Sequence, residues 1–290
     1  METPFPPFEP HGEPGRPGAK IRNIPIRVMV PNFITVLAIC AGLSGIRLAF
    51  EGRFETAVLM VLIAAFLDGI DGRLARALNA TSKFGEQMDS LADIVNFGAA
   101  PALVLYAYLI DRAGSVGWIA ALLFAIACGL RLARFNIQLE DPNRPAWRAD
   151  YFTGVPAPAG AVLVMLPIYL GFLGIGPSTT MAYVASAYAV LIALLLVSTL
   201  PVYSGKSAGI RVRGDIVIPL ILLGAFYVLL LASHPWQTLS VSAVAYLCSL
   251  PFSVRAFRAR QQREKRATDV ASTRAQQAPG DASEDDASGS

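Results

Sequence analysis

Charge is the first thing this sequence has little of. Only 16% of its 290 residues are Asp, Glu, Lys or Arg, and 54% are hydrophobic. A soluble domain usually carries about 25% charged residues. This balance excludes an ordinary soluble globular protein and predicts an integral membrane protein. Because the net charge is only +3, we expect no nucleic-acid partner.

Histidine is scarce as well, and the cysteines are isolated. The two histidines are His11 and His234. The three cysteines lie in separate apolar runs, without the spacing of metal ligands: Cys40, Cys128 and Cys248. These absences argue against histidine-based catalysis and against a zinc site. They leave oxygen ligands as the material for any metal site.

The hydrophobic residues gather in about eight runs, each near the ~20 residues that a helix needs to cross a bilayer. The sequence therefore predicts an all-α, polytopic membrane protein. The expected spans are roughly 33–50, 54–78, 87–110, 115–138, 157–174, 180–200, 214–232 and 236–254.

Lys and Arg alternate between the two sides of these spans. They collect in the N-terminal lead, in every second connection and after residue 254. The other connections are short and poor in basic residues: 51–53, 111–114, 175–179 and 233–235. By the positive-inside rule, both termini are cytoplasmic and the number of spans is even.

The two ends of the chain differ in composition from the middle. Residues 1–20 are rich in Pro and Gly, lack the apolar stretch of a signal peptide and predict a disordered lead. Residues 21–255 are expected to form the membrane domain. Residues 256–290 begin basic and continue as a polar stretch predicted to be disordered. The basic part fits either a contact with anionic headgroups or an ordinary solvated helix end.

Four aspartates interrupt the apolar sequence between residues 68 and 93. Asp68 and Asp71 are three residues apart, and Asp89 and Asp93 are four apart, so each pair shares one face of a helix. The polar stretch 79–83 predicts a turn between the two helices, with Thr81 or Ser82 as the N-cap of the second. Antiparallel helices joined there would bring all four carboxylates together.

Such a cluster needs compensation, because one carboxylate at membrane depth costs about 2.5–3.5 kcal/mol. An all-oxygen site favours Mg²⁺, Mn²⁺ or Ca²⁺, and two ions would suit a displacement at phosphorus. Gly72 would allow a close backbone approach, and Arg76 would neutralise a phosphate. Asp68 lies about 14 residues, or roughly 21 Å, into its helix, so the site should open near the cytoplasmic leaflet. The alternative is a set of buried ion pairs with Arg73 and Arg76.

The same stretch resembles the signature of the CDP-alcohol phosphotransferase family. That signature is Asp, two residues, Asp-Gly, two residues, Ala-Arg, eight residues, Gly, three residues, Asp, three residues, Asp. It is complete here, as Asp68, Asp71, Gly72, Ala75, Arg76, Gly85, Asp89 and Asp93. The resemblance implies an enzyme that moves a phosphatidyl-type group from a CDP-activated alcohol to a second alcohol and releases CMP. It also implies a homodimer.

The resemblance assigns roles to individual residues. The four aspartates would hold two divalent ions, Mg²⁺ or Mn²⁺, and Asp93 would also be the base that takes the acceptor's proton. Gly72, Arg76 and Ser82 would contact the CDP moiety. So would Asn32 and Thr35, unless they only cap the first helix.

Two further stretches are similar to the phosphatidylserine synthase branch of the family: 131–136 and 152–160. This implies CDP-diacylglycerol as the donor, L-serine as the acceptor and a bacterial inner membrane with the site facing the cytoplasm. The acceptor-binding candidates are Arg131, Arg134, Asn136 and Lys206. Arginine suits a carboxylate because it can donate two parallel hydrogen bonds.

Other interpretations remain for these residues and for the function. The arginines also fit positive-inside anchors or a grip on the donor phosphates. The protein could be a sister enzyme that uses glycerol 3-phosphate or an inositol phosphate. It could also be a membrane protein that binds or conducts divalent cations without catalysis.

Overall fold

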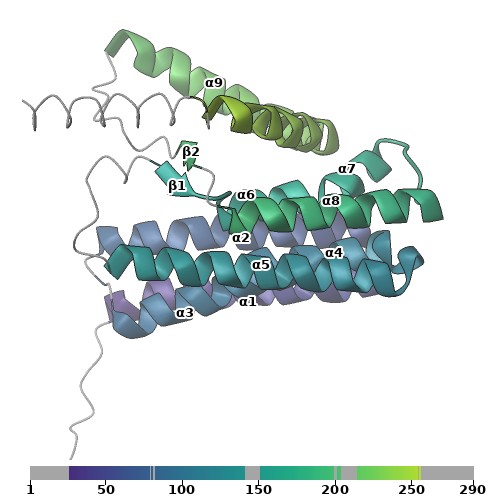
Figure 1. Cartoon of the computed structure of the whole chain (residues 1–290). Coiled ribbons are helices and arrows are strands. Elements are labelled where there is room, and N and C mark those ends of the chain that lie inside the picture. Colours follow the sequence, from purple (N-terminus) through teal and green to yellow (C-terminus); the bar gives the residue numbers. More distant parts are fainter. Residues whose placement is uncertain are drawn as a thin grey trace, which may run out of the picture.

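The chain folds into a bundle of long helices that lie side by side (Figure 1). The computed structural model describes residues 26–78, 80, 82–140, 151–198, 201–203, 214–253 and 255. The predicted N-terminal lead, the predicted C-terminal tail, Thr81 and Lys206 lie outside the described residues.

Most of the described residues are helical, in an order close to the predicted runs. The first half contains α1 (Ile26–Phe50), α2 (Phe54–Ala77), α3 (Lys83–Asp93), the π-helix η1 (Ile94–Ala99), α4 (Ala100–Tyr108), the short η2 (Ile110–Ala113) and α5 (Ser115–Glu140). The second half contains β1 (Tyr151–Thr153), α6 (Ala157–Val164), α7 (Leu166–Phe172), α8 (Thr179–Val197), β2 (Pro201–Tyr203), α9 (Gly214–Ser233) and a last helix over residues 235–253.

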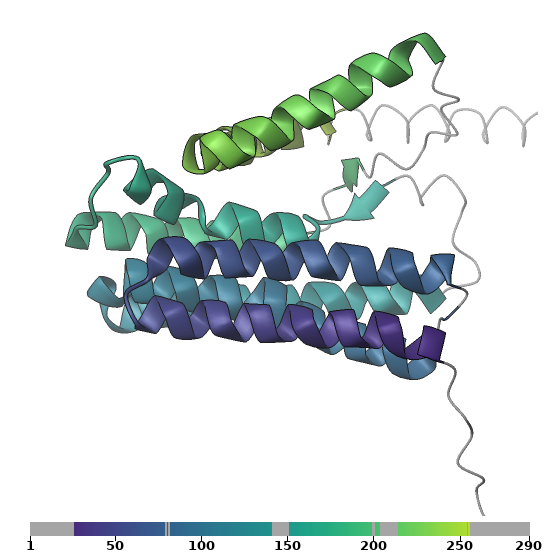
Figure 2. The same ribbon diagram turned by 180° about the vertical axis from the view of Figure 1, so that it is seen from behind.

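Helices α1 and α2 form a hairpin, visible as neighbouring purple and blue helices in Figure 2. Small residues let their backbones approach closely. A Cβ atom added to Gly45 would lie 3.1 Å from the carbonyl oxygen of Ala57. Such small contacts are typical of helix pairs in membranes, where close packing replaces the hydrophobic effect. The hairpin holds the start of α1 beside the end of α2.

The continuous helical segment made of α3, η1 and α4 changes its winding in the middle. There, η1 follows Asp93 directly. Two glycine contacts hold η1 between its neighbours, because Gly42 of α1 packs against Asn96 and Gly98 packs against Cys128 of α5. A π segment holds an extra residue per turn and is often found near a functional site.

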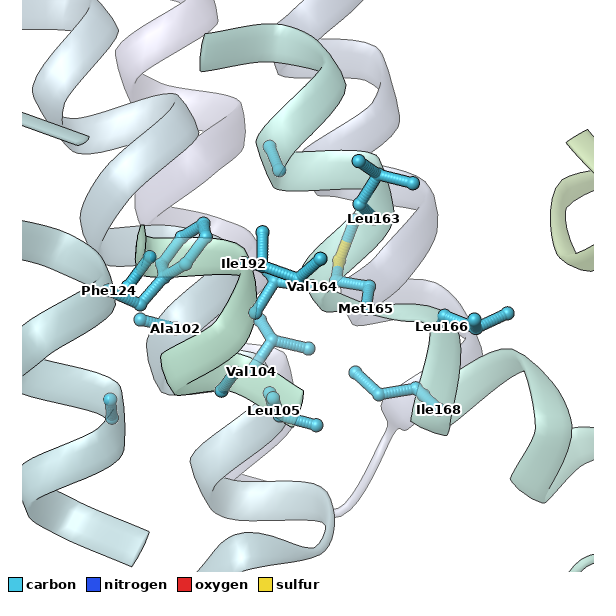
Figure 3. Close-up of a cluster of buried hydrophobic side chains, with 14 of the residues drawn as sticks. Ala102, Val104, Leu105, Phe124, Leu163, Val164, Met165, Leu166, Ile168 and Ile192 are labelled. Atoms are coloured by element: carbon cyan, nitrogen blue, oxygen red, sulfur yellow. The ribbon is translucent and has the colours of Figure 1, made fainter. Parts of the chain in front are cut away.

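The apolar core lies where α4, α5, α6, α7 and α8 meet. Figure 3 shows Leu105, Phe124, Val164 and Ile192 in this cluster, and all four are at most 1% exposed. Met165 separates α6 from α7 and is itself fully buried. The predicted single span over 157–174 is therefore two short helices, since Pro167 allows the second to start afresh.

Two short strands add a feature that an all-α prediction does not contain. β1 and β2 pair antiparallel, with Phe152 opposite Val202. Gly154 follows β1 with a φ of +81°, and a Cβ there would lie 2.6 Å from the carbonyl oxygen of Leu196. The chain turns so closely against α8 at this point that only glycine fits. The ladder joins the segment before α6 to the segment after α8.

The C-terminal hairpin lies along one side of the bundle (Figures 1 and 2). α9 is the more distant of its two helices, and its side chains from Val217 to Leu230 are exposed. The helix over 235–253 packs on the bundle with one face, burying Leu239, Ala243 and Leu250. Trp236 anchors its start, with its ring 4.6 Å from that of Phe172.

Four helical segments of the described chain are long and apolar enough to cross a bilayer: Met29–Phe50, Lys83–Tyr108, Ser115–Gln138 and Thr179–Val197. Two more, Ala157–Phe172 and Val217–Ser233, are apolar but shorter. The predicted membrane protein is supported, and the described residues of each predicted run are largely helical. Four of the eight predicted spans are therefore both long enough and apolar enough to cross a bilayer.

Candidate metal and substrate site

The aspartates come from facing stretches of α2 and α3. One carboxylate oxygen from each of Asp68, Asp71 and Asp89 lies within 4.8 Å of the other two. Asp93, one helical turn after Asp89, interacts electrostatically with Asp68, Asp71 and Asp89. The structure therefore brings all four predicted ligands together, as their spacing on two facing helices predicts.

Asp71 is the most firmly held of the four. Its carboxylate is only 2% exposed. Its Oδ2 accepts a hydrogen bond of 2.5 Å from the Thr35 hydroxyl, and its Oδ1 accepts one of 2.6 Å from the backbone N–H of Gly72. The Thr35 oxygen also lies 3.1 Å from the carbonyl of Pro31, but its single proton can serve only one acceptor at a time. Thr35 thus links the start of α1 to the carboxylate cluster.

The donor set fits a hard divalent cation. Within the described part of the chain, Asp68 Oδ1 is buried and has no hydrogen-bond partner. A buried carboxylate oxygen without a partner is costly, and a cation would supply the missing contact. The cluster offers only oxygen atoms, which suit Mg²⁺ or Mn²⁺ better than softer metals.

The first turn of α3 meets α1 beside this cluster. Ser82 caps α3, since its hydroxyl accepts a hydrogen bond of 3.0 Å from the N–H of Gly85. The predicted cap is therefore confirmed at Ser82. A Cβ on Gly85 would lie 2.9 Å from Asn32 Oδ1, so Asn32 packs directly on the signature glycine. Asn32, Thr35 and Ser82 thus line one edge of the site.

The opposite edge is open. Gly72 and Arg76 are exposed on the last turns of α2, and a Cβ on Gly72 would meet no atom within 4 Å. Nothing in the described part of the chain explains a glycine there. Free space beside the carboxylates is what a nucleotide would need for close backbone approach.

Two of the predicted acceptor ligands have other partners. Arg134 Nη1 donates a hydrogen bond of 2.7 Å to the carbonyl of Val197, at the end of α8. Asn136 Nδ2 donates one of 3.0 Å to the hydroxyl of Ser90, next to Asp89. Both side chains connect helices around the site, which gives each of them a structural role.

Among the described residues, Arg131 is the predicted acceptor ligand whose side chain remains available. Its side chain is 7% exposed, and its guanidinium lies 5.3 Å from the ring centre of Phe135, a cation–π contact. It interacts electrostatically with Asp93. Among the described residues, its Nε is buried without a hydrogen-bond partner. The buried Nε–H is therefore an unsatisfied donor, and Arg131 interacts electrostatically with the proposed base.

The sequence analysis did not identify Asn96. This residue is fully buried three positions after Asp93, and both polar atoms of its amide lack partners within the described chain. Its only sequence signal is an uncharged polar residue inside an apolar run, which is too common to single it out. Its contact with Gly42 requires both the π segment and the bundle packing.

Comparison with known proteins places this geometry in a family. Residues 28–203 match the model of the CDP-alcohol phosphatidyltransferase family, and residues 215–251 match a second model, CDP-alcohol phosphatidyltransferase 2. The chain belongs to the CDP-alcohol phosphatidyltransferase family.

Curated relatives narrow the comparison to one activity. A protein of Mycobacterium leprae (strain TN) is 40% identical over 228 residues, which cover 78% of this chain and 74% of the relative. A protein of Mycobacterium tuberculosis (strain ATCC 25618 / H37Rv) is 38% identical over 246 residues, 84% of each chain. One of Helicobacter pylori (strain ATCC 700392 / 26695) is 35% identical over 221 residues, 76% of this chain and 88% of the relative. All three are named CDP-diacylglycerol–serine O-phosphatidyltransferase.

Proposed function

We propose that this protein transfers the phosphatidyl group of CDP-diacylglycerol to L-serine, giving phosphatidylserine and CMP in phospholipid biosynthesis. The observation that carries the proposal is the named activity of relatives that align with most of the chain. The carboxylate cluster between α2 and α3 supplies a site with matching chemistry.

The reaction is a displacement at the phosphorus that carries diacylglycerol. The serine hydroxyl oxygen forms a bond to this phosphorus, and the bond from phosphorus to the oxygen bridging to CMP breaks. Asp93 takes the proton of the hydroxyl, and CMP leaves with the bridging oxygen. Serine, not water, must be the nucleophile, so the acceptor has to be held beside Asp93.

Members of this family are metal-dependent in general. Here Asp68, Asp71, Asp89 and Asp93 would hold the ions, which we propose to be two, Mg²⁺ or Mn²⁺. When bound, they supply positive charge that offsets the pyrophosphate and its leaving group. Thr35 and the N–H of Gly72 orient Asp71 for this role.

The residues that line the edges of the site are assigned to the two substrates. Asn32, Gly72, Arg76 and Ser82 would bind the CDP moiety, and the supporting observations are the open space at Gly72 and the packing of Asn32 on the start of α3. Arg131 would face the acceptor.

The membrane arrangement is also a proposal. We infer eight spans within residues 21–255, both termini in the cytoplasm and the site opening towards the cytoplasmic leaflet of a bacterial inner membrane. The supporting pattern is the alternation of basic connections with short neutral ones. The homodimer is inferred from family resemblance.

The test is CMP release by the purified full-length protein in detergent micelles with CDP-diacylglycerol and Mn²⁺. CMP should appear only when L-serine is added, and EDTA should stop it. Glycerol 3-phosphate and an inositol phosphate serve as competing acceptors. CMP release with either of them and none with L-serine would make the protein a sister enzyme. No binding of CDP-diacylglycerol in the presence of Mn²⁺ would favour a cation-binding protein without catalysis.

A further inference from the structure

The last helix packs on the bundle along one face. The packed face of residues 235–253 contains Leu239, Ala243 and Leu250, and Tyr246 packs against the core on the same side. Its start is fixed on α7 by Trp236. Tyr246 is ten residues further, roughly 15 Å along the helix. This rise carries it towards the end of the bundle that holds the carboxylates.

Tyr246 and Arg131 each have an unused hydrogen-bonding atom in this part of the bundle. The two residues interact electrostatically. The Tyr246 hydroxyl and Arg131 Nε are both buried, and neither has a partner within the described chain. Leaving two such buried groups unpaired is costly, so this arrangement favours an absent ligand over chance packing.

The chemistry of the two groups limits what that ligand can be. Arg131 Nε–H can only donate, and the tyrosine hydroxyl can donate to a neighbouring anion. Two donors, one of them charged, match the two oxygens of a carboxylate. Asp93 does not fill this place, because no ion pair joins it to Arg131 within the described residues. Arg134 does not compete, since it is bound to the end of α8.

We propose that Arg131 and Tyr246 form a two-donor pocket for the carboxylate of the acceptor amino acid, and that the last helix thereby sets acceptor specificity. The inference rests on the proposed function. It assigns the C-terminal hairpin a part in substrate recognition, beyond the signature-bearing helices. The acceptor's hydroxyl is then directed towards Asp93, which interacts electrostatically with Arg131.

The experiment compares Tyr246→Phe with Tyr227→Phe in the full-length enzyme. Tyr227 is a matched control because it lies on the neighbouring α9 and is exposed, with its hydroxyl 3.1 Å from that of Ser242. CMP release is measured against L-serine and against L-serinamide, which keeps the hydroxyl and amine but has a neutral amide in place of the carboxylate.

Tyr246→Phe should raise KM for L-serine roughly tenfold, the loss typical of a hydrogen bond to a charged group. KM for CDP-diacylglycerol should stay within about twofold, and the preference for L-serine over L-serinamide should shrink. The melting temperature should not fall, because the variant removes a buried hydroxyl that has no partner among the described residues. Tyr227→Phe should leave all of these values unchanged.

Three results would overturn the pocket. They are an L-serine KM no higher than that of Tyr227→Phe, an equal rise in KM for CDP-diacylglycerol, and a lowered melting temperature. If the unmodified protein uses glycerol 3-phosphate and not L-serine, the proposed function fails. The carboxylate pocket, which rests on that function, then fails with it.

Discussion

Removing the Thr35 hydroxyl should weaken metal binding while leaving the fold intact. Thr35 is 4% exposed and donates its proton to Asp71 over 2.5 Å. Thr35→Val keeps the shape of the side chain and removes this donor. A hydrogen bond to a charged group contributes about 1.5–3 kcal/mol, and each 1.4 kcal/mol is a factor of ten in affinity.

The structure favours the lower end of this range. Asp71 keeps its second hydrogen bond, from the N–H of Gly72 at 2.6 Å, so its carboxylate stays partly oriented. We expect the Mn²⁺ concentration for half-maximal CMP release to rise about tenfold, as is typical when a group that orients a metal ligand is lost. Saturating Mn²⁺ should restore most of the turnover.

Two variants make this prediction specific. Thr35→Ser retains the hydroxyl and should keep the original Mn²⁺ dependence. Thr56→Val makes the same change on α2 but 15 residues before Asp71, roughly 22 Å along the helix, and should have no effect. An unchanged Mn²⁺ dependence in Thr35→Val would refute the reasoning. A raised KM for CDP-diacylglycerol in its place would assign Thr35 to the nucleotide, as the family resemblance implies.

Three further predictions concern the base and the signature glycines. Asp93→Asn should reduce turnover at least about 100-fold while CDP-diacylglycerol still binds, measured by CMP release and by lipid binding; equal loss of both would remove its role as base. Gly72→Ala should lower activity but not melting temperature, since a Cβ there meets nothing within 4 Å, and Gly224→Ala on α9, equally open, should lower neither. Gly85→Ala places a Cβ 2.9 Å from Asn32 Oδ1 and should raise KM for CDP-diacylglycerol. In a double variant with Asn32→Ala, the loss of free energy calculated from this KM should be smaller than the sum of the losses in the two single variants.

The sequence predicted the centre of the site because that centre is local. Asp68 and Asp71 share a helix face through their spacing alone, and so do Asp89 and Asp93. The turn between the pairs is short, so the two faces must meet. The cap at Ser82 follows from the same local chemistry. These features require no knowledge of how distant helices pack.

The surroundings of the site depend on distant contacts, and there the sequence was less informative. Arg134 looked available for a substrate, but its partner is Val197, 63 residues away. The pairing of Phe152 with Val202 joins two connections whose sequences show no strand pattern. Tyr246 lies 115 positions after Arg131 in the sequence. Hydropathy predicts which segments are helical, but not which side chains meet across helices.

The π-helix has a consequence for how this gene can change. Asp93 precedes η1 and Pro101 follows it, so η1 sets the angle between the acidic part of this span and its apolar part. A π turn holds one residue more than an α turn, so deleting one residue from 94–99 can restore an α-helix in which the flanking segments keep their faces. In a plain α-helix, the same deletion would rotate everything after it by about 100°. A one-residue deletion should therefore be tolerated better within these six residues than elsewhere in this span.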